Sequence, residues 1–347
     1  MKSIILKPYQ NEFLGHMKNR VVMSAMSRSF SDKNHLCTDE IMKYYELRAK
    51  NNMALIITEG VVIHPSADGY NNVPHMWNNN QSESWKKTTT AVHKFNTKIF
   101  CQLWHCGRIS HQDYTGGIPP VSSTDKAAEG INRQNNKPYS IPHKLTKKEI
   151  LEVYDMFIKS GELAIKAGFD GLELHFGHGY LVDQFLDSRI NDRTDEYGGS
   201  IENRCRFAIE LTKLMITKFG PNKIIIRISP SRDMGGIYDW PNLNEMINYI
   251  IPELNKIGLR MLDISCARAN YFETSGRIIR TVRKIWPYVI IGGASLTINE
   301  AEEEIKNNYL DMITWGRYIL ANPDFVNKIE HNIKLIEFDR DMLNRLE

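Results

Sequence analysis

The sequence predicts a TIM (β/α)8 barrel that forms one domain over residues 1–347. Three observations support this fold class. About eight short apolar runs alternate with longer amphipathic runs along the chain. No linker-like segment or shift in composition divides the sequence. No GxGxxG motif follows an early strand, which disfavours a doubly wound dinucleotide-binding sheet.

The eight predicted strands are short and almost continuously hydrophobic, as expected for parallel strands that are buried on both faces. They cover residues 20–23, 54–58, 98–103, 171–174, 224–228, 261–264, 289–291 and 312–314.

Amphipathic stretches between these strands predict the helices. They cover residues 38–51, 83–97, 147–167, 201–219, 243–257, 277–285 and 298–308, followed by a last helix that Asn322-Pro323 opens. Thr146 and Glu149 form a capping-box pattern, and Ser200 is a suitable N-cap. Gly168 is placed as the glycine that ends the third helix.

Two long segments interrupt the alternation. Residues 106–143 separate the third strand from its helix, and residues 230–242 follow the fifth strand. Both begin where a strand ends, on the face that carries the active site in TIM barrels. Long loops of this kind are commonly functional, so we expect residues 106–143 to lie over the active-site face.

Composition and charge exclude several classes of protein. The net charge is +3, which is too small to indicate a nucleic-acid partner. No apolar run reaches the roughly 18 residues that a membrane helix needs, and the N-terminus lacks a signal-peptide core. Five cysteines without a CxxC pair indicate reduced thiols that serve in packing. We therefore expect a cytoplasmic protein.

The ends of the last two strands indicate a phosphate site. The seventh strand ends in Gly292-Gly293-Ala294-Ser295, and the eighth ends in Gly316-Arg317. TIM barrels often bind phosphate between these two loops, where glycines allow backbone amides to approach and a guanidinium clamps the oxygens. The alternative is that the glycines only make turns and that Arg317 is a surface charge.

Polar residues also occur in or just after other strands. Ser27 follows the first strand, Gln102 lies within the third and Arg227 lies within the fifth. Buried polar groups need hydrogen-bond partners. Either an internal network or a bound polar heterocycle would supply them.

The fourth strand leads into His175, His178 and Tyr180. A metal site is one interpretation, with Asp183 or Asp187 as a further ligand, but the glycines around His178 indicate a loop rather than a chelating helix. Two hydrogen-bonded core histidines are the second interpretation. The third is a donor pair that binds a substrate oxygen, with Tyr180 as a proton source at the end of a hydride transfer.

Six motifs make the chain resemble the Old Yellow Enzyme family of FMN-dependent NADPH dehydrogenases and ene-reductases, which includes N-ethylmaleimide reductase-like members. The motifs are NRVVMSAMSRS (19–29), ALIITEG (54–60), KIFCQLWHCGR (98–108), AGFDGLELHFGHGYLVDQFLDSRINDRTDEYGGSIENR (167–204), IIIRISP (224–230) and ITWGRYILANPDF (313–325). The long central motif is the most specific of them.

The resemblance implies a role for each matching residue. FMN would bind without a covalent link, with its ring held by Ser27, Gly60, Gln102 and Arg227. Its phosphate would be held by Gly293, Gly316 and Arg317. The substrate oxygen would be bound by His175 and His178, with Tyr180 as proton donor and Trp104 lining the pocket.

The resemblance also implies an activity. NADPH or NADH would reduce the flavin, which would then reduce the C=C bond of a small α,β-unsaturated carbonyl or nitro compound. The protein would be a monomer or homodimer. Two alternatives remain at this point: a metal-dependent barrel hydrolase, and an FMN- or ligand-binding protein without significant turnover. The chain departs from the family in having Ala25-Met26-Ser27 where Pro-Met-Thr or Pro-Met-Cys is usual.

Overall fold

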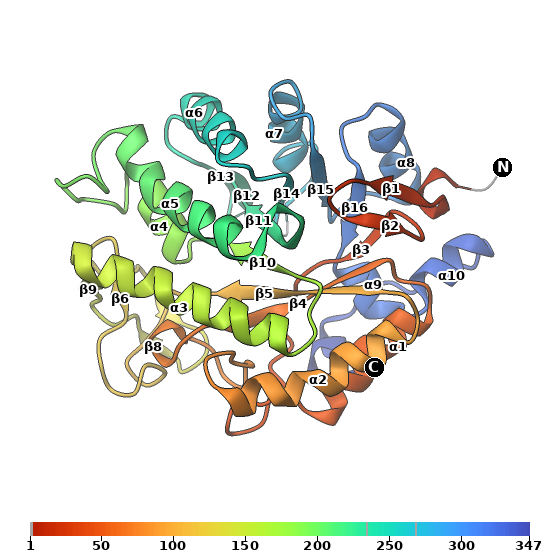
Figure 1. Cartoon of the computed structure of the whole chain (residues 1–347), viewed down its shortest axis with the longest axis horizontal. Coiled ribbons are helices and arrows are strands. Elements are labelled where there is room, and N and C mark those ends of the chain that lie inside the picture. Colours follow the sequence, from red (N-terminus) through yellow and green to blue (C-terminus); the bar gives the residue numbers. More distant parts are fainter. Residues whose placement is uncertain (1–2, 234, 268) are drawn as a thin grey trace.

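Eight parallel strands close into a barrel in the spatial order β10, β11, β14, β15, β16, β3, β4 and β5 (Figure 1). The structure is a computed structural model that describes residues 3–233, 235–267 and 269–347. The barrel strands are β3 (Val21–Met23), β4 (Leu55–Val62), β5 (Lys98–Trp104), β10 (Gly171–His175), β11 (Ile224–Ile228), β14 (Met261–Ile264), β15 (Val289–Gly293) and β16 (Met312–Trp315). This confirms the predicted (β/α)8 barrel and each of its eight strands.

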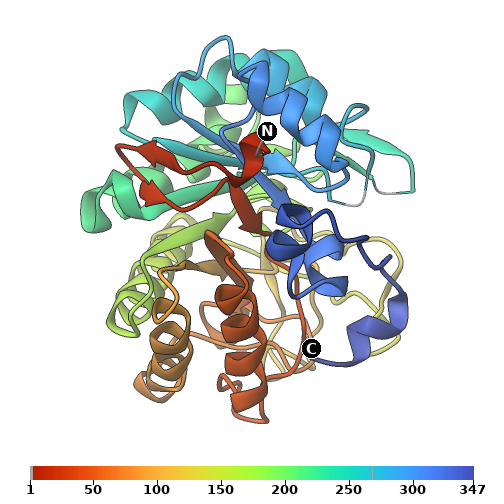
Figure 2. The same cartoon turned by 90° about the vertical axis from the view of Figure 1, so that its right-hand side faces the viewer.

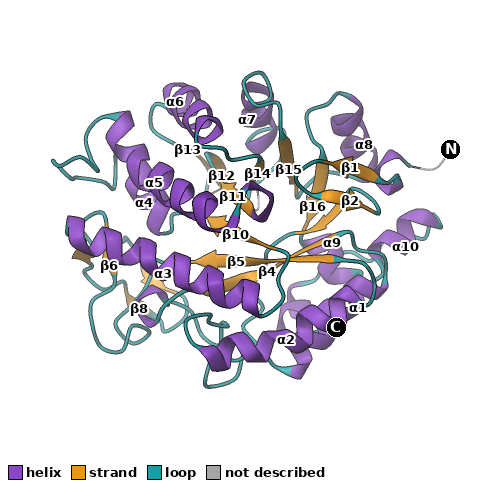
Figure 3. Cartoon of the chain, in the orientation of Figure 1, coloured by secondary structure: helices purple, strands orange, loops and turns teal. Residues whose placement is uncertain are grey.

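Helices surround the barrel, as Figure 3 shows by colour. They are α1 (Asp39–Lys50), α2 (Asn79–His93), α3 (Lys147–Lys166), α4 (Leu181–Leu186), α5 (Ile201–Phe219), α6 (Leu243–Lys256), α7 (Ser275–Val282), α8 (Ile298–Lys306), α9 (Arg317–Ala321) and α10 (Phe325–Glu330). Short 3-10 turns occur at η1 (Ile4–Leu6), η2 (Pro65–Ala67), η3 (Pro221–Lys223) and η4 (Arg340–Asn344).

Local capping signals explain where the helices begin and end. The Thr146 and Glu149 side chains form the predicted capping box on α3, and Ser200 caps α5. The predicted start of α2 was four residues too late, because Asn78 caps the helix by accepting from the Gln81 N–H.

The last predicted helix was placed incorrectly. Asn322-Pro323 does not open it. These residues separate α9 from α10, which begins at Phe325 after Asp324. The short α4 and α9 were not predicted, because five- and six-residue helices carry too few turns for a periodic pattern.

Apolar side chains form two cores. The larger core lies between the strands and the outer helices, whereas the smaller one fills the interior of the barrel. An N-terminal hairpin of β1 (Tyr9–Asn11) and β2 (Gly15–Met17) contributes Leu14 and Met17 to the interior core, so it closes that end of the barrel. Figure 2 shows this hairpin, in red, against the barrel.

The long loops carry small strands of their own. Residues 106–143 contain β6 (Val121–Ser122), β7 (Ile131–Asn132) and β8 (Lys137–Pro138) and end at β9 (His143–Lys144). The segment after β11 forms a hairpin of β12 (Ser231–Asp233) and β13 (Ile237–Asp239), and residue 234 within it lies outside the described residues. In Figure 1 the first loop and the β1–β2 hairpin lie at opposite ends of the molecule.

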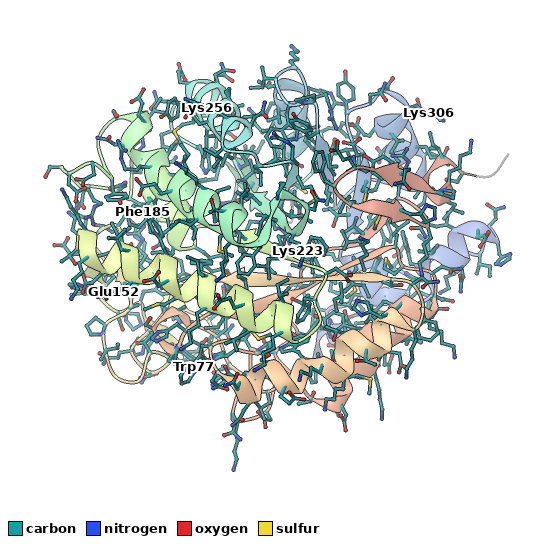
Figure 4. All side chains as sticks on the ribbon, in the orientation of Figure 1. Trp77, Glu152, Phe185, Lys223, Lys256 and Lys306 are labelled. Carbon is teal, nitrogen blue, oxygen red and sulfur yellow. The ribbon has the colours of Figure 1, made fainter. Side chains whose placement is uncertain are left out.

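Charged side chains lie on the outer helices, including Glu152 on α3, Lys256 on α6 and Lys306 on α8 (Figure 4). The five cysteines are free and buried, as their number and spacing predicted. Within the described residues, no helix has both the length and the apolar character needed to cross a membrane.

The hairpin core gives a testable prediction about stability. Leu14 is 1% exposed, so Leu14→Ala should lower the free energy of unfolding by about 2–5 kcal/mol through lost burial and a residual cavity. Urea unfolding of the purified protein measures this. Leu151→Ala on α3 is the matched control, because Leu151 is 56% exposed and should change stability by less than about 0.5 kcal/mol. If Leu14→Ala lowered the free energy of unfolding no more than Leu151→Ala does, the hairpin would not support the barrel.

Candidate active site

A cavity of about 650 Å³ lies at the carboxyl ends of several barrel strands. The residues that line it come from segments far apart in the sequence: Ser24, Ala25, Met26, His178, Arg227, Ala267, Ala269, Ala294, Ser295, Gly316, Arg317, Tyr318, Glu337 and Phe338. A cavity of this size accommodates a cofactor or a drug-sized ligand. The cavity therefore lies on the face of the barrel where the active site was predicted.

The two histidines are held by hydrogen bonds in the loop that leaves β10. The Gly177 N–H donates to His175 Nδ1 at 3.4 Å, which leaves the proton of a neutral ring on Nε2. His178 has a left-handed backbone (φ +59°), and its N–H donates to Ser229 Oγ at 2.7 Å. The ring centroids of His175 and His178 are 4.9 Å apart. His175 and His178 therefore lie at the end of β10 and in the loop that follows it, and they do not occupy neighbouring positions on one face of a helix.

Both histidines are held in the neutral state. Burial lowers the pKa of His175 well below its ordinary value, and the nearby Arg227 and Arg232 guanidinium groups lower it further. Burial also lowers the pKa of His178, with His175 and the same two arginines adding to the effect. At neutral pH each ring therefore carries one N–H and can donate a single hydrogen bond without bringing in a charge.

Tyr180 lies beside the histidines at the start of α4. Its ring centroid is 5.1 Å from that of His175 and 4.9 Å from that of Trp104. Its hydroxyl is 2.7 Å from the hydroxyl of Tyr70. Burial raises the pKa of Tyr180 well above its ordinary value, so the side chain keeps its proton. Sequence reasoning missed Tyr70, because a tyrosine in a loop carries no distinctive spacing.

A buried charged network lies on the strands beneath the cavity. Gln102 Nε2 donates to Glu173 Oε2 at 2.6 Å, and Arg227 Nε lies 3.5 Å from Asp263 Oδ2. Burial, and then the charge of Asp263, raises the pKa of Glu173 to about 8. The internal-network interpretation of Gln102 and Arg227 therefore holds, although Arg227 also lines the cavity. Glu173 and Asp263 were missed, although a lone acid within an apolar strand is a usable signal.

The loops after β15 and β16 meet at the cavity, as the phosphate prediction requires. Arg317 lines the cavity with its guanidinium carbon 5.6 Å from the Phe338 ring centroid, and among the described residues no carboxylate pairs with it. The Ala294 N–H already donates to the Thr314 carbonyl at 2.6 Å, and the Ser295 N–H donates to the Gly293 carbonyl. The guanidinium, rather than those two amides, is thus the group left free to bind an anion.

Three glycines are fixed by close approach or backbone geometry. A Cβ on Gly316 would lie 2.9 Å from Met26 Sδ, and Gly293 has a φ of +132°. A Cβ on Gly60 would lie 2.5 Å from Trp104 Cε3. Gly60 therefore leaves the space that lets the buried Trp104 indole reach the Tyr180 ring.

Neither Ser27 nor Tyr271 is among the residues that line the cavity. Ser27 is exposed and lies one residue beyond the cavity-lining segment 24–26. In the segment after β14, Tyr271 is fully buried and donates to Glu304 Oε2 at 2.6 Å, so it packs rather than lines the cavity. Residue 268 in this segment lies outside the described residues.

The aspartates considered as metal ligands are engaged elsewhere. Asp183 Oδ2 is 2.9 Å from Arg232 Nη1 and also accepts from the Gly179 N–H. Asp187 is held by Arg189 and by the Tyr238 hydroxyl. These carboxylates brace the histidine loop and the loop after β11 instead of facing His175 and His178.

Comparison with known proteins identifies the family. The family model described as "NADH:flavin oxidoreductase / NADH oxidase family" matches residues 5–335. The chain belongs to this family. Rice (Oryza sativa subsp. japonica) 12-oxophytodienoate reductase 7 is 33% identical and 12-oxophytodienoate reductase 1 is 35% identical. Each alignment covers 97% of this chain, with 90% and 88% of the relative.

The fold comparison agrees. The solved structure of the Old Yellow Enzyme homologue from Zymomonas mobilis superposes with a TM-score of 0.91 at 28% identity, covering 98% of this chain and 96% of that one. The resemblance to the Old Yellow Enzyme family is thereby confirmed. The protein is an FMN-dependent oxidoreductase that uses NAD(P)H and reduces activated C=C bonds, with FMN held non-covalently. Family membership does not favour a metal-dependent hydrolase.

The neutral histidines give a prediction about pH. His175 and His178 should stay unprotonated when the pH is lowered through the ordinary histidine pKa near 6.5, because burial lowers the pKa of both rings well below that value. Histidine-selective ¹⁵N NMR measures this, with His93 as an internal control because its hydrogen bond to Asp170 raises its pKa. Because the unfolded chain binds these protons more readily, stability should also fall as the pH drops below about 6.5. Ordinary titration of both rings would contradict the neutral donor pair.

Proposed function

We propose that His175, His178 and Tyr180 carry the reduction of an α,β-unsaturated carbonyl or nitro compound in this barrel. The observation that carries the proposal is the convergence of two neutral histidines and a protonated tyrosine beside a cavity that Arg227 and Arg317 also line. Bound FMN, reduced by NADPH or NADH, would supply the hydride. The chain's own residues would supply orientation, charge stabilisation and a proton.

The histidines would bind the oxygen of the activating group. Because His175 Nδ1 accepts from the Gly177 N–H, the Nε2–H of His175 is left as a donor. His178 Nε2 lies 3.1 Å from Ser265 Oγ, and this contact orients the His178 ring. As a hydride reaches the β-carbon, negative charge builds on the carbonyl or nitro oxygen. Two preorganised N–H groups in a buried site stabilise that charge.

Tyr180 would protonate the α-carbon. Its raised pKa makes it a weak acid that does not ionise in the resting site, so the proton leaves only when a strongly basic carbon is present. The Trp104 ring, 4.9 Å away at 79°, holds the phenol edge-on. We propose that Trp104 lines the substrate pocket in this way.

The cofactor would occupy the cavity described above. Ser27, Gly60, Gln102 and Arg227 are the proposed ring-binding residues, and Gly293, Gly316 and Arg317 are the proposed phosphate-binding residues. The fit rests on the size of the cavity and on Arg317, a guanidinium without a carboxylate partner among the described residues. It also rests on the narrow approach at Gly316, where any side chain would meet Met26.

We propose that residues 1–347 work as one FMN-binding domain, with the loop at 106–143 over the active-site face. The substrate would be a small activated alkene, with no nucleic-acid or membrane partner. The protein would be a cytoplasmic monomer or homodimer. The modest net charge of +3 supports a small-molecule enzyme rather than a nucleic-acid-binding protein.

The visible spectrum of the purified protein, followed by anaerobic titration, tests the function. We expect a flavin band that bleaches with NADPH and returns when 2-cyclohexenone is added. A flavin band that bleaches with NADPH but does not return when 2-cyclohexenone is added would indicate a flavoprotein without this reaction.

Substitution of Tyr180 should separate the two half-reactions. Tyr180→Phe removes the acidic proton but keeps the ring, so enone reduction should slow by about 10²–10⁴-fold while flavin reduction by NADPH stays near normal. Anaerobic stopped-flow absorbance measures both steps. An equal loss in the two half-reactions would remove Tyr180 from the role of proton donor.

Substitution of Arg317 should weaken cofactor binding. Arg317→Ala removes a charge-assisted contact to phosphate, so FMN affinity should fall by about tenfold or more. Fluorescence titration of the flavin-free protein measures this, and Lys306→Ala on the outer surface is the charge-matched control. A variant that purifies with full FMN and unchanged affinity would place the phosphate elsewhere.

A further inference from the structure

We infer that Tyr70 is a proton-relay residue that passes its proton to Tyr180 while Tyr180 protonates the substrate. Tyr70 acts through Tyr180 and does not itself react with the substrate. The inference rests on the proposed role of Tyr180 as proton donor, and the experiment below separates the failure of one from the failure of the other.

The hydroxyl groups of Tyr70 and Tyr180 form a hydrogen bond with each other. They lie 2.7 Å apart, and within the described part of the chain neither hydroxyl has another hydrogen-bond partner. If Tyr70 donates to Tyr180, the Tyr180 proton is left free to point at the substrate. Both rings pack on Trp104, with centroid distances of 4.8 and 4.9 Å. The shared indole fixes both phenols in one geometry.

The backbone of Tyr70 is held as firmly as its ring. Asp68 Oδ1 accepts from the N–H of Gly69 at 2.6 Å and from the N–H of Tyr70 at 3.1 Å. The other oxygen of Asp68 is 2.9 Å from His75 Nε2. Ser110 Oγ donates to the Asp68 carbonyl at 2.5 Å, which ties this turn to the loop at 106–143. A hydroxyl presented from such a braced turn suits proton transfer, which requires a short and constant distance.

The relay lowers the energetic cost of the step in which Tyr180 gives up its proton. When the α-carbon takes the proton, a C–H bond forms and the Tyr180 O–H bond breaks, leaving a phenolate. Burial makes that phenolate costly, since it raises the pKa of Tyr180 well above its ordinary value, and Tyr70 and Cys106 add to the effect. Transfer of the Tyr70 proton re-forms the Tyr180 O–H bond and moves the negative charge to Tyr70. A water proton then restores Tyr70, so the cycle consumes one proton and no further electrons.

The surroundings favour this direction of transfer. Burial also raises the pKa of Tyr70, but the exposed Arg133 in the loop at 106–143 acts to lower it. The partly buried Tyr139 lies in the same loop and interacts with both tyrosines. The charge of Arg133 therefore makes negative charge on Tyr70 less costly.

Tyr70→Phe tests the relay with 1-nitrocyclohexene as the probe. Hydride addition to a nitroalkene gives a nitronate, an anion stable enough that hydride delivery and carbon protonation can be followed separately by absorbance. We expect flavin reduction by NADPH and reoxidation by the nitroalkene to stay within about twofold of wild type. Decay of the nitronate should slow by about 10–100-fold. The slow step should also become dependent on the concentration of buffer acid, which replaces the missing donor.

Tyr114→Phe is the matched control. The Tyr114 hydroxyl donates to Asn71 Oδ1 at 3.0 Å, so this variant loses a tyrosine hydroxyl beside the same turn but not the contact with Tyr180. Wild-type nitronate decay in Tyr70→Phe, or equal slowing in both variants, would overturn the relay. If wild-type reduced enzyme is not reoxidised by either 2-cyclohexenone or the nitroalkene, the proposed function itself fails.

A second measurement needs no substitution. In mixtures of H2O and D2O, protonation of the nitronate by the wild-type enzyme should depend on the deuterium fraction in a curved manner, because two protons move. A linear dependence, which indicates a single proton in transit, would contradict the relay.

Discussion

The guanidinium of Arg227 is the interaction on which the active site depends most. It lies 3.5 Å from the buried carboxylate of Asp263, and it donates to Ser24 Oγ and Ser265 Oγ at 3.2 and 3.1 Å. These contacts connect β11 with β14 and with the residues after β3 and β14. Because a buried charge must be paired, the strands around it cannot slide relative to one another without an energetic penalty. The polar strand ends are thereby brought together beneath one cavity.

The same charge shapes the chemistry above it. Burial, and then the charges of Arg227 and Arg232, make protonation of His175 unfavourable, so the histidine pair stays neutral where an exposed pair would begin to titrate. A neutral pair donates hydrogen bonds without attracting a second anion, which suits binding to an oxygen that becomes negative only during the reaction. The acids that balance Arg227, Glu173 and Asp263, lie on the barrel strands beneath the cavity and are not among its lining residues.

The loop at 106–143 contacts the turn that carries Tyr70. It contributes Ser110 to the brace around Asp68, and its Arg133 and Tyr139 lie near the Tyr70–Tyr180 pair. The histidine loop is braced separately by Asp183, which binds Arg232 and the Gly179 N–H. The residues closest to the proposed chemistry are thus held by polar contacts between loops, whereas the barrel below is held by apolar packing.

The sequence alone determined the barrel, its eight strands and most of the helix boundaries, because strand burial and helix capping are local patterns. It also placed His175, His178, Tyr180, Arg227 and Arg317 at strand ends, where a barrel brings its functional groups together. Only the tertiary structure decided what those residues contact. The pairing of Gln102 with Glu173, the hydroxyl contact between Tyr70 and Tyr180, and the Phe338 ring near Arg317 join segments 71, 110 and 21 positions apart. No local periodicity encodes such contacts, because closure of the barrel and the path of its loops set these distances.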